Sequence, residues 1–197
     1  REKLLLNFGG IWHVSEKVFF GQIFISLEHG WQALAVFVWI FYIYKRLADL
    51  ADIQPGDKVL EIGCGWGGFA TYVSEQIGAH VTGITISEAQ LAYAQSRLAD
   101  AGLDDRVDLK LMDYRDLRGR FDKIVSIEMF EAVGQAYWPT YFATVARMLK
   151  SGGRAVIQSI TIDHDAFQSY RDQPDFIQRY IFPGGMLPSM PMLETPV

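Results

Sequence analysis

A short apolar segment that leads directly into a glycine-rich turn limits the fold of this chain more than any other part of its sequence. Lys58–Ile62 has the composition of a buried strand, and four of the next six residues, Gly63–Gly68, are glycine. Phe69, Val73 and Ile77 then recur at helical spacing. Because glycine lets the backbone approach a ligand with no Cβ in between, a strand, a glycine turn and a helix in this order indicate the first unit of a nucleotide-binding α/β fold.

The alternation of strands and helices continues to residue 160. Four more strands are predicted, at 80–84, 107–111, 123–127 and 155–160. Helical spacing lies between them, first at 91–101 before Gly102, then at 141–149 before the glycines of 151–153. Strands that alternate with helices form right-handed βαβ units. We therefore expect an α/β fold with a Rossmann-like, mostly parallel sheet that is covered on both faces.

The predicted sheet stops after its fifth strand. The last ten residues, which begin at Pro188, contain three prolines and leave no room for two further strands. The fifth strand would then be an exposed apolar edge, which favours aggregation. Either residues 1–46 cover this edge, or the chain is a truncated form of the fold.

Composition narrows the classes of function. The chain has 197 residues, of which 50% are hydrophobic, and a formal net charge of −5. This length is enough for one substantial core, and the acidic balance offers no broad basic surface, so we expect no nucleic-acid partner. The single cysteine excludes an intrachain disulfide and a multi-cysteine metal site, and we expect no metal.

Residues 1–46 form a separate, apolar amino-terminal segment, and the predicted cofactor-binding domain spans 47–197. Ala33–Tyr44 is an unbroken apolar run that ends at Lys45-Arg46. It is shorter than the roughly 20 residues that a spanning helix needs. Two readings are favoured over a membrane span. The segment is a helix or strand pair buried against the domain, or an element that contacts a membrane surface or an acyl chain.

The glycine turn formally fits a dinucleotide pattern, with glycines at the first, third and sixth positions from Gly63. Three features point away from NAD. Glu61 lies two residues before the first glycine, where it can meet an amino group, and Trp66 makes the loop bulky. The second strand is followed by Gly83–Ser87, which lacks the acid that usually holds a ribose diol.

Five segments in the same order resemble the cyclopropane-fatty-acyl-phospholipid synthase family, which includes the mycolic acid cyclopropane synthases. The resemblance covers roughly Leu47–Pro188 and rests on these segments: Val59–Gly68, Gly83–Ser87 with Gln90, Asp113–Leu117, Met129–Gly134 and Tyr180–Gly185. It implies an S-adenosylmethionine-dependent methyltransferase.

The resemblance also implies roles for individual residues. The methionine part of S-adenosylmethionine would be lined by Glu61, Gly63, Gly65 and Gly67. The ribose would be held by Thr85, Ile86 and Gln90. The adenine would be held by Asp113 and Tyr114, with Ile127 at the end of the fourth strand beside it.

The predicted catalytic residues are Glu131, Tyr137, Gln158 and Ile160. In the family, the glutamate of Met129-Phe-Glu131 helps to hold a bicarbonate ion that acts as general base. The ring of Tyr137 could face a cation, as could those of Trp138 and Tyr141, or these rings could anchor a helix.

The chain departs from the family at two places around the bicarbonate site. The family's His-x-Ile reads Gln158-Ser-Ile160 here, and glutamine can hydrogen-bond to an anion but cannot take up a proton. The family's upstream Tyr-Ser-Cys segment has no counterpart in residues 1–46. Bicarbonate is therefore an open expectation.

We expect an enzyme that transfers a methyl or methylene carbon from S-adenosylmethionine to an unsaturated fatty acyl chain of a phospholipid, by C-methylation or cyclopropanation. We expect it in the cytoplasm, with peripheral contact to a membrane. A small-molecule methyltransferase and a cofactor-binding module without activity remain alternatives.

Overall fold

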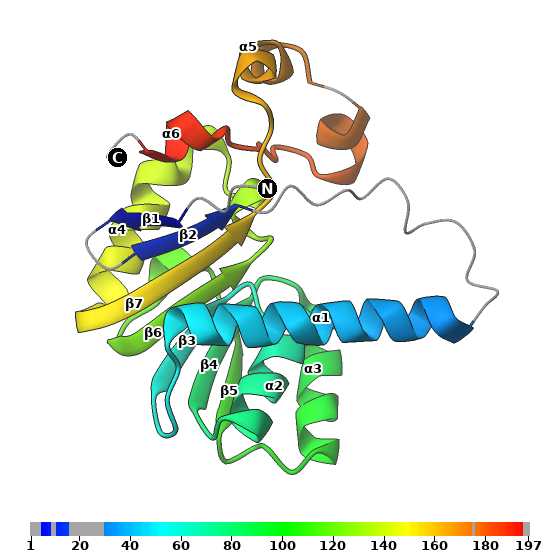
Figure 1. Cartoon of the computed structure of the whole chain (residues 1–197), viewed down its shortest axis with the longest axis vertical. Helices are drawn as coiled ribbons and strands as arrows, with labels where there is room; N and C mark the ends of the chain where they lie inside the picture. The colour runs from blue at the N-terminus through cyan, green and yellow to red at the C-terminus, as the bar shows by residue number, and fades with distance from the viewer. Residues whose placement is uncertain (1–4, 9–10, 16–29, 175, 195–197) are drawn as a thin grey trace.

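The computed structural model describes residues 5–8, 11–15, 30–174 and 176–194. Seven strands of these residues form one sheet in the order β1-β2-β7-β6-β3-β4-β5 (Figure 1). All neighbouring strands from β2 to β5 are parallel, and β1 is antiparallel to β2. The strands are β1 Leu5–Phe8, β2 Ile11–Ser15, β3 Lys58–Ile62, β4 His80–Thr85, β5 Val107–Leu111, β6 Phe121–Ile127 and β7 Leu149–Ser159.

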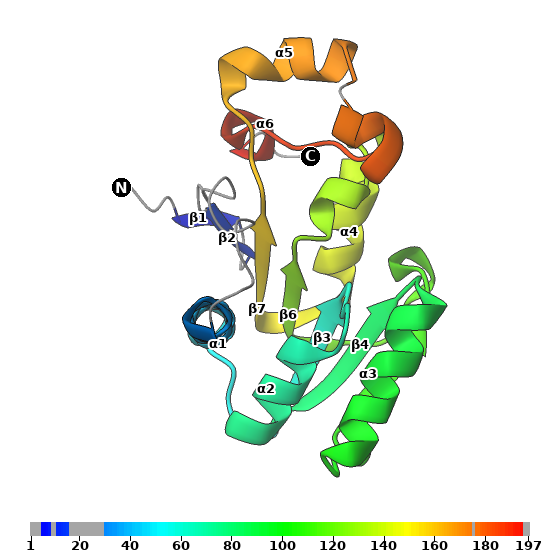
Figure 2. The same ribbon diagram turned by 90° about the vertical axis from the view of Figure 1, so that its right-hand side faces the viewer.

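Helices cover both faces of the sheet. One buried cluster joins α1, α2 and α3 to the sheet, and a second joins α4, α5 and α6 to the opposite face. Figure 2 shows α1 and α4 on the two sides of β6 and β7. The α-helices are α1 Gly30–Ala51, α2 Gly68–Gln76, α3 Glu88–Asp100, α4 Trp138–Met148, α5 His164–Asp172 and α6 Met190–Glu194. The shorter helical turns are η2 Tyr114–Asp116, η3 Phe130–Ala132, η4 Gln135–Tyr137 and η5 Ile177–Ile181.

The predicted βαβ arrangement with five parallel strands is confirmed as β3 to β7. The first, third and fourth of these strands contain the predicted segments, and β4 runs one residue longer than predicted, to Thr85. β7 differs, because it begins at Leu149 and passes through the two glycines that were predicted to end the preceding helix. The backbone of Leu149 is already extended. The strand ends at Ser159, so Ile160 lies just beyond it rather than inside it as predicted.

The edge of β7 that the sequence left open is paired with an amino-terminal strand. Residues 11–15 of β2 lie parallel to residues 155–159 of β7. Of the two readings offered by the sequence, the pairing agrees with the one in which residues 1–46 cover this edge.

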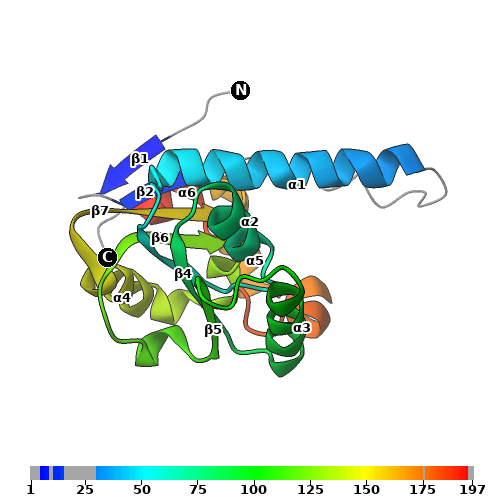
Figure 3. The same ribbon diagram turned by 90° about the horizontal axis from the view of Figure 1, so that it is seen from below.

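The apolar run of residues 33–44 is part of one long helix, α1, which continues past Lys45-Arg46 to Ala51. Its carboxy-terminal half packs on the sheet, where Leu47, Ala48 and Ala51 are buried. Figures 1 and 3 show its amino-terminal half projecting past α2 and α3. Across the described parts of the chain, no helix combines the length and the hydrophobicity that a membrane crossing needs.

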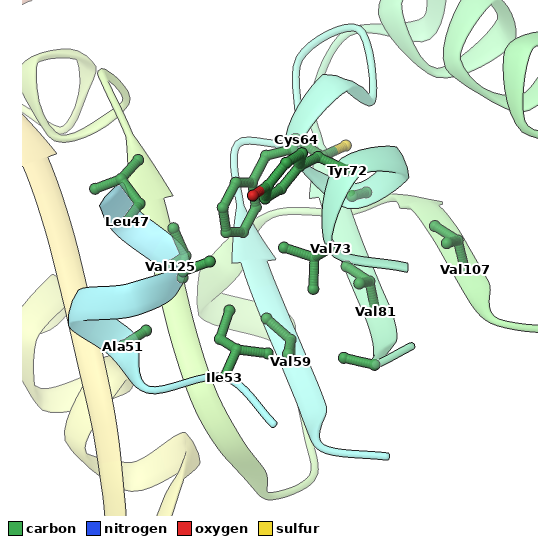
Figure 4. Packing of buried hydrophobic residues seen from close by; sticks show 14 of the residues in the cluster. Leu47, Ala51, Ile53, Val59, Cys64, Tyr72, Val73, Val81, Val107 and Val125 are labelled. Carbon is green, nitrogen blue, oxygen red and sulfur yellow. The ribbon is translucent and has the colours of Figure 1, made fainter. Parts of the chain in front are cut away.

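The α1 face of the sheet is held by small aliphatic side chains. Figure 4 shows Leu47 and Ala51 of α1 beside Val125 of β6, with Ile53 and Val59 next to them. Val59 and Val125 are 0% exposed. This packing holds the carboxy-terminal half of α1 against β6 and β7, and Tyr44 of the same helix lies next to Gly68 at the glycine turn.

Candidate functional site

The glycine turn between β3 and α2 adopts a backbone shape that requires glycine. Gly63, Gly65 and Gly67 all have positive φ, at 82°, 50° and 75°. A Cβ on Gly63 would lie 2.6 Å from Cγ of Met129, whereas a Cβ on Gly65 would meet no atom within 4 Å. Gly63 is therefore needed for packing against the segment after β6, and Gly65 leaves open space above the turn.

Glu61 places a carboxyl group beneath this turn. Its side chain is 2% exposed, and Oε2 has no hydrogen-bond partner in the described structure. Burial raises the pKa of Glu61 well above its usual value, and the backbone N–H of Ala70 in α2 opposes this only in part. A buried acceptor without a donor is costly. The position therefore suits a ligand that brings a donor, such as an ammonium group.

A cavity of about 450 Å³ opens next to the turn, between α1, α2 and α3. Its lining combines the carboxyl of Glu61 and the guanidinium of Arg97 with the aromatic rings of Tyr44, Trp66 and Tyr72. Ile127, predicted to lie beside the adenine, also lines this cavity.

Tyr44 of α1 is a site residue that the motif analysis did not find. Its hydroxyl lies directly over Gly68, the first residue of α2, so closely that a Cβ on Gly68 would clash with it. Burial and the charge of Glu61 raise the pKa of Tyr44. Only its position at the end of an aromatic run before the strand could have drawn attention to it, and such a run fits a core equally well.

The residues expected at the ribose form a small hydrogen-bonded group at the end of β4. The hydroxyl of Thr85 donates to the side-chain oxygen of Gln90 over 3.0 Å and accepts from the backbone N–H of Ser87 over 3.1 Å. Ile86 between them is 80% exposed. An apolar side chain this open is not a core residue, and it is available to contact a ligand.

Asp113 and Tyr114, expected at the adenine, follow β5. Arg115 holds Asp113 through both carboxylate oxygens, over 2.9 and 2.6 Å, and this pairing lowers the pKa of Asp113. The ring of Tyr114 packs edge-on against Tyr141 with centroids 5.5 Å apart. The guanidinium of Arg115 lies 6.0 Å from the ring centroid of Tyr137.

Of the three rings considered near the catalytic residues, two are structural. Trp138 and Tyr141 are 3% and 0% exposed and anchor α4 to the sheet. Tyr137 is 54% exposed and faces Arg115. Its predicted catalytic role stays a prediction.

The predicted catalytic residues Glu131, Gln158 and Ile160 meet where β6 and β7 end. Oε1 of Glu131 accepts hydrogen bonds from the hydroxyl of Ser159, over 3.0 Å, and from the backbone N–H of Ile160. Oε2 of Glu131 is buried and has no partner among the described residues. The side-chain amide of Gln158 donates from Nε2 to Oε1 of Glu128 over 3.3 Å.

Glu128 is the second residue that the motif analysis missed. It is the residue after β6, and it adopts a φ of 48°. Few non-glycine residues adopt such a conformation, and strained backbone of this kind clusters at functional sites. No pattern in the sequence identified it, because a glutamate next to a strand end is most often a solvated charge.

These features define a class of protein: a Rossmann-like α/β fold with a glycine turn and a ligand cavity at the carboxyl edge of its sheet. The chain belongs to the mycolic acid cyclopropane synthetase family, whose model matches residues 43–197.

Characterised relatives agree with this assignment. The chain is 46% identical over 144 residues to tuberculostearic acid methyltransferase UfaA1 of Mycobacterium tuberculosis. The aligned region covers 73% of this chain and 34% of that protein. It is 42% identical over 146 residues to cyclopropane-fatty-acyl-phospholipid synthase of Escherichia coli, with 74% and 36% covered. The chain thus spans little more than a third of the length of these relatives.

Solved structures share the fold. The crystal structure of mycolic acid cyclopropane synthase CmaA1 complexed with SAH and CTAB superimposes with a TM-score of 0.70 at 28% identity, over 77% of this chain and 56% of that one. The cyclopropane synthase MmaA2 from Mycobacterium tuberculosis gives a TM-score of 0.70 at 28% identity, over 78% and 57%.

Proposed function

We propose that this chain carries the cofactor-binding and catalytic part of an S-adenosylmethionine-dependent methyltransferase that acts on an unsaturated fatty acyl chain of a phospholipid. The observation that carries the proposal is the buried, unpartnered oxygen of Glu61 beside the open space over Gly65. S-adenosylmethionine fits both features, because its amino-acid end carries hydrogen-bond donors for Glu61 and the open space leaves room for the flat nucleoside attached to it.

The residues present fit this cofactor. Glu61 would accept from its ammonium group, and Gly63, Gly65 and Gly67 would let its methionine part approach the backbone. Thr85, Ile86 and Gln90 would hold the ribose. The adenine would contact Asp113, Tyr114 and Ile127. When bound, the cofactor supplies an electrophilic methyl group on a positively charged sulfur.

An alkene is a suitable acceptor for that methyl group. Methyl transfer to one alkene carbon leaves a positive charge on the other, and loss of a proton then gives a neutral product. Loss of a proton from the new methyl group closes a cyclopropane ring. A methylene branch forms instead when a hydride first shifts from the methylated carbon to the cationic carbon and the methyl group then loses its proton. A saturated methyl branch would need a separate reductant. The relatives named as a tuberculostearic acid methyltransferase and as cyclopropane synthases support an acyl substrate.

Peripheral membrane contact follows from the substrate and is supported by two exposed apolar surfaces. On α1, Val38, Phe41 and Tyr42 are 61%, 52% and 54% exposed. On the carboxy-terminal side, four large apolar side chains are more than half exposed, namely those of Phe176, Tyr180, Ile181 and Phe182. Aromatic side chains favour the interface between lipid and water. We propose a cytoplasmic enzyme that takes its substrate from the inner face of a membrane.

We keep the proposed division into an apolar amino-terminal segment, 1–46, that contacts acyl chain or membrane, and a cofactor-binding domain, 47–197. Helix α1 crosses this boundary without a break, so the two parts would move together at that point. Residues 1–4, 9–10 and 16–29 of the segment lie outside the described residues.

Calorimetry with S-adenosylmethionine, followed by transfer of a labelled methyl group to vesicles, tests the proposal. We expect the cofactor to bind and the label to enter monounsaturated phosphatidylglycerol or phosphatidylethanolamine, with none in fully saturated vesicles of the same headgroups. Label in a soluble acceptor only would instead indicate a small-molecule methyltransferase. Binding of the cofactor with no transfer to any acceptor would indicate a module without activity.

A further inference from the structure

Two glutamates face the same place at the carboxyl ends of β6 and β7, and the proposed reaction uses only one proton acceptor. Building on the proposed function, we propose that Glu128 is the base that removes the proton from the methylated acyl chain, that Gln158 positions its carboxylate, and that this protein does not hold bicarbonate beside Glu131.

Glu128 lies next to the groups that would bind the cofactor. The residue before it, Ile127, lines the cavity at the glycine turn. The residue after it, Met129, packs so closely on Gly63 that a Cβ there would be 2.6 Å from its Cγ. Of the two sequence neighbours of Glu128, one lines the cavity and the other packs on the glycine turn. The backbone of Glu128 is therefore held close to the proposed cofactor site.

The structure fixes the Glu128 carboxylate from β7. The backbone N–H of Glu128 donates to the carbonyl of Gln158 over 3.0 Å, and Nε2 of Gln158 donates to Oε1 of Glu128 over 3.3 Å. Gln158 itself is 7% exposed, so its amide is held within the protein. A neutral amide can orient a carboxylate by donating a hydrogen bond to it, and it does not compete with the carboxylate for a proton. Both properties suit a positioning residue for a base.

The surroundings suit a base of moderate strength. Partial burial raises the pKa of Glu128, the negative charge of Glu131 raises it further, and the hydrogen bond from Gln158 lowers it. These two residues, Glu131 from η3 and Gln158 from β7, are the groups that act on Glu128. A carboxylate whose pKa moves toward neutrality accepts a proton more readily while it remains ionised at working pH.

The same residues fit bicarbonate poorly. Oε1 of Glu131 is already occupied by Ser159 and Ile160, which leaves only its buried Oε2 as an acceptor, and no Lys, Arg or His of the described chain forms an ion pair with Glu128 or Glu131. An added anion would face two carboxylates that no ion pair among the described residues offsets, and like charges this close repel. Gln158 cannot supply the missing positive charge.

The step balances without a further reactant. A C–H bond of the transferred methyl group breaks, and the proton moves to the Glu128 carboxylate. Its electron pair closes the ring on the cationic carbon, or forms the methylene double bond once a hydride shift has moved the positive charge to the methylated carbon. Water then takes the proton from Glu128 before the next turnover.

Glu128→Gly tests the proposal, because glycine accepts a φ of 48° freely while the side chain is removed together with its carboxylate. Asp104→Asn, an exposed acid in the turn after α3, is the matched control. We expect both variants to bind S-adenosylmethionine like the parent chain. Turnover on monounsaturated vesicles should fall by at least ~100-fold in Glu128→Gly, as for loss of a general base. Formate should restore part of it, whereas bicarbonate should not stimulate the parent chain.

A donor with a fully deuterated methyl group adds a readout that a structural role would not move. The parent product should retain two deuterium atoms, and the isotope effect on turnover should grow in Glu128→Gln. Undiminished turnover in Glu128→Gly, or saturable stimulation of the parent chain by bicarbonate, would overturn this inference and leave the proposed function intact. No methyl transfer by the parent chain to any vesicle would overturn both.

Discussion

Glu61 and Glu131 each keep one buried carboxylate oxygen without a partner in the described structure. Buried polar atoms are nearly always hydrogen-bonded in folded proteins, so such an atom beside the glycine turn, at Glu61, calls for an explanation. At Glu61 the cost of burial is partly avoided by protonation, which is why its pKa is raised. A ligand with an ammonium group would supply the missing donor and favour the ionised form.

Glu61→Gln should separate stability from binding. The amide cannot carry the buried charge, so the free energy of unfolding of the ligand-free protein at neutral pH should rise. Loss of the charged acceptor should weaken S-adenosylmethionine binding by roughly 10–100-fold. Urea denaturation and calorimetry measure the two effects. A variant that is less stable and binds normally would contradict this account of Glu61.

The same group sets the direction of the pH dependence. Because the pKa of Glu61 is higher in the folded protein than its ordinary value of 4.5, the folded state binds more protons in the interval between the two values. The contribution of Glu61 to stability is thus present below pH 4.5 and is lost as the pH rises toward the folded pKa. In Glu61→Gln this decline should vanish, as followed by thermal unfolding at a series of pH values, with other titrating groups unchanged.

The glycine turn acts as an element, because its three left-handed residues shape one continuous surface. The backbone N–H groups of Gly63 and Cys64 both donate hydrogen bonds to the carbonyl of Ile84, over 3.0 and 2.9 Å. This ties the turn to the end of β4, where the ribose residues begin. The two halves of the proposed cofactor site are therefore connected through the backbone.

Gly65→Val should abolish cofactor binding and leave the fold largely intact. Valine at a φ of 50° is strained and would project into the open space above the turn. Gly102→Val is the matched control, since Gly102 has a φ of 65°, open space around it and a place at the end of α3. Both variants should lose about 1–2 kcal/mol of stability. Calorimetry should show binding in the control alone, and normal titration of Gly65→Val would refute the assignment of the turn.

The carboxy-terminal half of helix α1 has one buried face and one exposed face. Leu47 is 2% exposed in the core, whereas Tyr42, little more than one turn earlier, is 54% exposed. Leu47→Ala should destabilise the protein by about 2–5 kcal/mol through the lost burial and the cavity left behind. Tyr42→Ala should change stability by less than about 1 kcal/mol and should reduce sedimentation with anionic vesicles. Equal stability losses for the two variants would show that α1 is packed differently.

At the scale of the whole molecule, one sheet separates two cores and joins them through neighbouring residues. Ile124 and Val125 of β6 are both 0% exposed, and they belong to the clusters on opposite faces. Since each core depends on the same strands, the described structure should unfold as one cooperative unit.

Ile124→Val and Val125→Ala test this cooperativity. Each should lower the free energy of unfolding by about 0.5–3 kcal/mol, and in both variants circular dichroism and tryptophan fluorescence should give the same urea midpoint. Two separated transitions in either variant would mean that the two faces fold independently.

The predictable part of the site is the part formed by residues close in sequence. Glu61 with its glycines, and Thr85 with Gln90, could be found because a turn and the first turn of a helix bring them together. Tyr44 and Glu128 could not, because their partners are Gly68 and Gln158, 24 and 30 residues away. The contact of Gln158 with Glu128 rather than Glu131 depends on the register of β6 against β7, which no local pattern encodes.

The sequence by itself determined the alternating strands and helices and the glycine turn, because periodicity and glycine act over a few residues. The resemblance of five segments in the same order indicated the family. The tertiary structure decided where β7 begins, that β2 pairs with its open edge, and that residues 33–44 belong to a helix running on to Ala51. Those outcomes depend on which distant surfaces bury one another and which strand edges find a partner. The free energy of such contacts comes from packing between segments, and a single segment does not contain it.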